Sequence, residues 1–192
     1  MEKIFDQLSD VVSTGSASAQ ERLMTPKEFV QLTADEVDRA SRYDRPLAVS
    51  VMLFDGLASY RQAEGQRRAD EMVERLLIHL VGLLRGPDRL ARLGPSDIGI
   101  IMPETTLKNA AAVAERIRRG VADEAQAVTT DKHKVTSSIG VAAMSPRMRD
   151  PKRFLMMACF ELRRAQSNGG DTVCVAAPDR VQLSIPRSGQ IH

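Results

Sequence analysis

The sequence predicts a single α+β domain, and three observations lead to that prediction. Helical and strand patterns follow one another in the order helix, strand, helix, hairpin, helix, strand, helix, strand. The 192 residues suffice for one domain with short extensions, and 43% of them are apolar, which is enough to bury a core. The formal net charge is only +2, so a strongly basic nucleic-acid-binding protein is not expected.

The first helix, strand and long helix have clear signals. Thr25 and Glu28 form a capping box with proline between them, so a helix is expected from here to about residue 42. Residues 47–54 are nearly all apolar and rich in β-branched side chains, which is typical of a central strand. One long helical pattern follows over residues 59–84, and a Gly-Pro pair ends it.

The second half begins with a hairpin. Strands are expected at residues 89–93 and 98–102, because they flank the turn sequence Gly-Pro-Ser-Asp. The remaining predicted elements are a helix over 106–121, a strand over 135–143, a helix over 151–167 and a strand over 172–177.

The two ends of the chain differ from this pattern. Residues 1–17 comprise an amphipathic segment and a linker of small residues, residues 18–177 the domain, and residues 178–192 a tail. The apolar residues of the first segment recur at helical spacing and are Ile4, Phe5, Leu8, Val11 and Val12. We expect residues 1–12 to act in association, on a partner or a second copy, because a helix this short is not stable alone.

Export and membrane signals are missing from the sequence. The start lacks the basic region and apolar run of a signal peptide, and no stretch approaches 18 uninterrupted apolar residues. We therefore expect a cytoplasmic protein with no membrane span. Cys159 and Cys174 lack any CxxC or Cys/His cluster, so buried free thiols are expected in place of a disulfide or zinc site.

Four blocks of the sequence resemble one known protein family. The hairpin resembles the strand, GGDEF turn and strand of diguanylate cyclases, and other blocks match the family's AExIR helix, VTxSIGVA strand and closing helix. These blocks are residues 91–103, 111–118, 135–142 and 158–173. Because they agree in register, the chain resembles a GGDEF domain over roughly residues 18–177. The resemblance implies the cyclase palm fold, a central and mostly antiparallel sheet surrounded by helices.

Most catalytic positions of that family carry other residues here. In active members, a DxD pair and an acidic hairpin residue hold two divalent metals. Leu53 and Ser96 stand at the first DxD position and the hairpin position, and neither is a carboxylate. Further replacements fall at positions that read guanine or approach phosphate, and these are Arg61, Pro95, Gln166 and Gly170. From these replacements we expect no catalytic residues, no metal site and no enzyme activity.

One binding site of the family keeps its residues. Many cyclases carry RxxD shortly before the hairpin, an inhibitory site that binds cyclic di-GMP, and this register holds Arg85 and Asp88. Arg116 stands where the family has a third contributor on the following helix. Guanidinium groups can donate paired hydrogen bonds to guanine or phosphate, and a carboxylate can accept from the guanine edge. The alternative is that Arg85 and Asp88 form an ion pair at the end of a helix.

The function expected from the resemblance is an inactive GGDEF-type receptor for cyclic di-GMP. No cofactor is expected, and the signal would pass by contact to a partner protein of unknown identity, with a homodimer left open. The first alternative is a scaffold that binds no nucleotide. The second is a residual GTP binder or cyclase that uses Asp55, Asp70 and Asp97.

Overall fold

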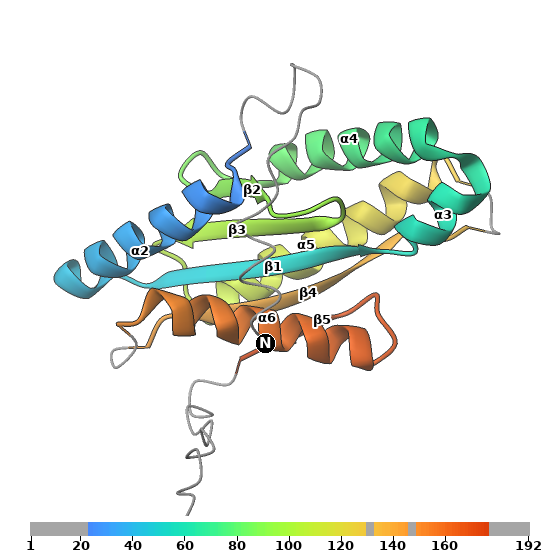
Figure 1. Cartoon of the computed structure of the whole chain (residues 1–192). Coiled ribbons are helices and arrows are strands. Elements are labelled where there is room, and N and C mark those ends of the chain that lie inside the picture. Colours follow the sequence, from blue (N-terminus) through green and yellow to red (C-terminus); the bar gives the residue numbers. More distant parts are fainter. Residues whose placement is uncertain (1–22, 130–132, 146–148, 177–192) are drawn as a thin grey trace, which may run out of the picture.

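The computed structural model describes residues 23–129, 133–145 and 149–176. The predicted N-terminal segment and the tail after residue 177 lie outside the described residues. The elements are α2 (Pro26–Tyr43), β1 (Leu47–Asp55), α3 (Leu57–Glu64), α4 (Gln66–Leu83), β2 (Arg89–Arg92), β3 (Asp97–Pro103), α5 (Leu107–Gln126), β4 (Thr136–Ala143), α6 (Pro151–Ser167) and β5 (Val173–Val175). Figure 1 shows their arrangement, a sheet between two layers of helices.

The sheet is mostly antiparallel, which confirms the predicted fold class. Its strand order is β2-β3-β1-β4-β5, with β1 antiparallel to both β3 and β4 and only β5 parallel to its neighbour. The nearly continuous apolar run of residues 47–54 is explained by this position, because a central strand is covered on both faces.

Two apolar cores lie on opposite faces of the sheet. Side chains of α3, α4 and α5 pack on one face, and side chains of α2 and α6 pack on the other. Gly140 allows the close approach of α6 to β4, since a Cβ there would lie 2.1 Å from the carbonyl oxygen of Ala158. In the described parts of the chain, no helix is long and apolar enough to cross a bilayer.

Several predicted elements are confirmed, and one is wrong. The capping box at the start of α2 is present, with the Thr25 amide donating to Glu28 Oε2 at 2.7 Å. The helix over 151–167 and the hairpin are also as expected. The single helix over 59–84 is instead two helices, α3 and α4, which meet at Gly65 with φ at 88°. Cys159 and Cys174 carry free thiols, and burial raises the pKa of the Cys159 thiol.

Candidate functional site

Arg85 and Asp88 face each other across the turn between α4 and β2. The Asp88 side chain is 1% exposed, and its carboxylate accepts a hydrogen bond from the Arg85 backbone amide at 3.0 Å. It also accepts from the Arg85 guanidinium, at 3.2 Å from Nη2 and 3.4 Å from Nε. The ion pair considered from the sequence is therefore present, but Asp88 lies in the interior of the turn.

A third residue holds the Arg85 guanidinium. Arg85 Nη2 also donates to Thr105 Oγ1 at 2.6 Å, and that hydroxyl donates to the Pro103 carbonyl at 2.9 Å. Thr105 follows β3, so Arg85 joins the α4–β2 turn to the C-terminal end of the neighbouring strand, β3. The Arg85 side chain nevertheless remains 54% exposed. It is thus a cation in a fixed position with one side open to solvent.

Arg116 reaches the same end of α4 from α5. Its Nη2 donates to the Leu83 carbonyl oxygen at 2.7 Å, and Leu83 is the last residue of α4. This contact satisfies one of the carbonyl groups that a helix leaves unpaired at its C-terminus. Arg116 therefore contacts a residue that precedes Arg85 by two positions in the chain, and Arg116 itself is exposed.

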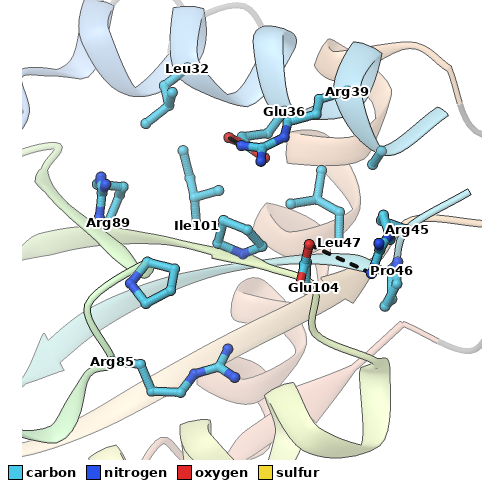
Figure 2. Close-up of a pocket in the computed structure, with 13 residues that line it drawn as sticks. Leu32, Glu36, Arg39, Arg45, Pro46, Leu47, Arg85, Arg89, Ile101 and Glu104 are labelled. Carbon is cyan, nitrogen blue, oxygen red and sulfur yellow. Dashed lines mark ion pairs between the residues drawn. The ribbon is translucent and has the colours of Figure 1, made fainter. Parts of the chain in front are cut away.

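A hollow of about 350 Å³ opens on the α2 side of Arg85. Its apolar lining includes Leu32, Leu47 and Ile101, which come from α2, β1 and β3. The guanidinium groups around it belong to Arg39, Arg45, Arg85 and Arg89 (Figure 2). The acidic side chains beside it are Glu36, 3.5 Å from Arg39, and Glu104, 3.9 Å from Arg45.

Sequence reasoning did not identify Arg39, Arg45 or Arg89 as site residues. Arg39 lies near the end of α2, Arg45 just before β1 and Arg89 at the start of β2, and these places come together only through the strand order and the packing of α2 on the sheet. Arg89 is fixed by its own turn, since its Nη1 donates to the Gly86 carbonyl at 2.6 Å. A surplus of arginines at element boundaries is the only signal that the sequence offers for such a cluster.

The opposite end of β1 carries the positions that hold metals in the family. Leu53 lies opposite Asp97 in the sheet, and burial raises the pKa of the Asp97 carboxyl. Asp55 is engaged in the fold, because it accepts from Ser138 Oγ at 2.9 Å and from the Asp171 amide at 3.1 Å.

Asp70 belongs to α4, where its carboxylate accepts from Gln66 at 2.8 Å. Within the described ranges, no three His, Cys, Asp or Glu side chains form a group that could hold a metal ion. The residues at this end do not fit the pair of metals that the family uses, and we assign no metal-dependent step to them.

Comparison with known proteins identifies the family. The model of the family "Diguanylate cyclase, GGDEF domain" matches residues 23–172. YhcK of Bacillus subtilis is 29% identical over 128 residues, which are 66% of this chain and 36% of that protein. The probable diguanylate cyclase DgcC of Escherichia coli is 27% identical over 151 residues, which are 79% of this chain and 40% of that protein. The chain thus matches well under half the length of these relatives.

A solved structure agrees with the fold. The GGDEF domain of DgcB from Caulobacter crescentus, in complex with c-di-GMP, superposes with a TM-score of 0.74 at 18% identity. The superposition covers 86% of this chain and 98% of that domain.

These relatives correct one prediction. The expectation that the chain is not an enzyme is contradicted, because the matching family is that of diguanylate cyclases and DgcC is named as one. The prediction rested on the replaced residues Leu53 and Ser96, and a missing side chain at a family position does not by itself exclude activity. The fold and the match over residues 23–172 together show that this chain belongs to the diguanylate cyclase family of GGDEF domains.

Proposed function

We propose that this domain binds cyclic di-GMP at the α4–β2 turn and passes the bound state to a partner protein by contact. The observation that carries the proposal is the Arg85 guanidinium, which Asp88 and Thr105 hold in place while half of the side chain stays exposed. A cation that is already fixed loses little side-chain entropy when a ligand binds. In the described ranges, no hydrogen bond uses Arg85 Nη1, so this group is available to a ligand.

The chemistry of the turn suits a guanine dinucleotide. A guanidinium can donate two parallel hydrogen bonds to guanine O6 and N7, or grip a phosphate, and it can stack on a purine. Arg116 provides a second exposed cation at the same end of α4. Asp88 is too deeply buried to meet the ligand in this conformation, so its part in the site is to position Arg85.

The hollow beside Arg85 extends this surface. An apolar floor ringed by guanidinium groups is suited to a planar base with a phosphate beside it. The ion pairs of Arg39 with Glu36 and of Arg45 with Glu104 are long, and both arginine side chains are largely exposed, so an entering phosphate can compete with these carboxylates. The binding of c-di-GMP by the DgcB domain, which shares the fold, is consistent with the proposal.

Titration calorimetry with cyclic di-GMP tests the proposal directly. We expect saturable binding to the wild-type chain, and an absence of heat at high micromolar ligand would leave a nucleotide-independent scaffold. Cyclic di-AMP is the matched control ligand, because adenine presents a different pattern of donors and acceptors to Arg85.

Cyclase activity is the second candidate, and the names of the relatives favour it. Incubation with GTP and magnesium, followed by detection of cyclic di-GMP, decides it. Product above a buffer control would establish a cyclase. Binding of cyclic di-GMP without turnover would leave the receptor function alone.

A further inference from the structure

A groove of about 650 Å³ runs beside α4, away from the proposed cyclic di-GMP site. Its walls come from α3, α4 and the residues that end α5, and its apolar lining includes Tyr60, Met72, Ile78 and Val128. Ile78 is 58% exposed and Val128 is 44% exposed. Arg75 and Glu124 form an ion pair across the groove between α4 and α5.

The exposed apolar residues here are additional to those the core requires. The buried face of α4 already consists of Ala69, Met72, Val73, Leu76, Leu77 and Leu80. Ile78 and Val81 lie outside this face, one turn apart. In the part of the chain that the structure describes, two of the six exposed large apolar side chains, Ile78 and Val128, line the groove, and Val81 lies on α4 outside it. A gathering of this kind marks a surface that another segment covers.

The chain enters the domain on the same side. The Met24 amide donates to the Leu90 carbonyl at 3.1 Å, which places the first described residues along the outer edge of β2. Leu23 packs against the apolar core that α4 and α5 share. In Figure 1 the beginning of the described chain lies near the end of α4 that leads to β2. The described chain therefore begins close to α4.

The preceding segment is long enough to reach the groove. Residues 13–22 span up to about 33 Å when extended. The whole of α4, with 18 residues, is only about 27 Å long. Residues 4–12 occupy about 14 Å as a helix, which fits between Ile78 and the first turn of α4.

The composition of this segment matches the groove. Ile4, Phe5 and Leu8 form an apolar stripe at helical spacing. Glu2, Asp6 and Asp10 repeat every four residues and fall on the opposite face of such a helix, so they would face solvent when the apolar stripe is buried. The wall of the groove is mixed in charge, with Arg68 and Arg75 beside Glu71, Glu74 and Glu124, so the match rests on the apolar side chains.

The geometry points to residues 4–12 of the same chain as the occupant of this groove, with their apolar stripe on Ile78 and Val128. The sequence alone favoured a partner or a second copy, because it does not show an apolar groove within reach of the linker.

Disulfide trapping in the full-length chain tests the assignment. We expect Leu8→Cys with Ile78→Cys to form a cross-linked monomer under mild oxidation. The matched control is Leu8→Cys with Phe160→Cys, since Phe160 is 56% exposed but lies on α6, across the sheet from α4. Leu8→Cys alone reports any reaction with the native thiols. Covalent dimers in place of monomers would show that a second copy fills the groove, and trapping no greater than in the control would overturn the assignment.

A thermal double-mutant cycle gives a second, non-covalent test. Leu8→Asp and Ile78→Asp should each lower Tm by about 2–4 °C, and the double variant should lower it no further. For the control pair, Leu8→Asp and Phe160→Asp, the decrease in Tm of the double variant should equal the sum of the two single decreases. Because Leu8 lies outside the domain and Ile78 is exposed, a free segment predicts no effect of Leu8→Asp, and that result would refute the docking.

Discussion

Replacing Arg85 should weaken cyclic di-GMP binding more than replacing any arginine outside the site. A charge-assisted hydrogen bond contributes about 1.5–3 kcal/mol, and 1.4 kcal/mol corresponds to a factor of ten. With at least one such bond lost, Arg85→Ala should raise Kd by at least about tenfold. Arg85→Lys should be nearly as damaging, because an ammonium cannot make the paired planar contact.

The assay is titration calorimetry at one salt concentration, since phosphate contacts weaken as salt increases. The matched control is Arg67→Ala, because Arg67 lies on the first turn of α4, at the end of that helix far from the site. Arg67 is exposed and forms an ion pair with Glu71 at 2.6 Å, so its loss should not change Kd.

Folding must be checked beside binding. In Arg85→Ala the buried Asp88 carboxylate keeps its hydrogen bond from the backbone amide of residue 85 but loses the guanidinium. The loss should lower the free energy of unfolding by roughly 1–3 kcal/mol. Circular dichroism melts establish whether the variant is folded at the temperature of the titration. If it is not, Arg85→Lys retains a positive charge beside Asp88 and carries the comparison. Equal affinities for a folded Arg85 variant and the wild type would refute the site.

Three further predictions concern the surroundings of Arg85 and the stability of the fold. Thr105→Val removes the hydroxyl that holds Arg85 Nη2 but keeps the guanidinium, so calorimetry should show Kd raised by about two- to tenfold; an unchanged Kd would mean that this contact does not prepare the site. Hydrogen bonds from Arg118 and Arg119 lower the pKa of Glu115 to about 2, so its stabilisation is complete above the unfolded value near 4.5 and is lost as pH falls towards 2. The melting temperatures of wild type and Glu115→Gln should therefore differ at pH 7 and converge near pH 2. A difference in Tm that stays constant with pH would contradict this. Gly65→Ala should lower the free energy of unfolding by about 1–2 kcal/mol in urea melts, because φ is 88° at this residue. Gly82 lies in open space within α4, so Gly82→Ala should raise the free energy of unfolding by about 0.5–1 kcal/mol. Equal effects of the two substitutions would show that the backbone conformation at Gly65 does not matter.

The elements that local chemistry determines were predictable from the sequence. The capping box at Thr25 and Glu28 specifies the start of α2, and the turn residues between β2 and β3 specify the hairpin. The break at Gly65 was missed for a physical reason. A single glycine is tolerated within a helical pattern, and the apolar spacing continues across it, so periodicity does not reveal that its φ is positive.

The candidate site was predictable only in part, because burial is decided by tertiary structure. The spacing of Arg85 and Asp88 shows that both belong to one turn, but not that the turn closes over the carboxylate. A buried carboxylate requires a partner, and the guanidinium and backbone amide of Arg85 supply it for Asp88. In the site that we propose, the motif is therefore a unit in which Arg85 binds the ligand and Asp88 positions Arg85. The separation has a consequence for mutagenesis. Asp88→Asn and Thr105→Val remove contacts that hold Arg85, so each should reduce stability and affinity together, whereas Arg85→Lys keeps a cation beside Asp88 and should reduce affinity with a smaller loss of stability. The ratio of the two effects across these variants distinguishes a positioning residue from a ligand contact.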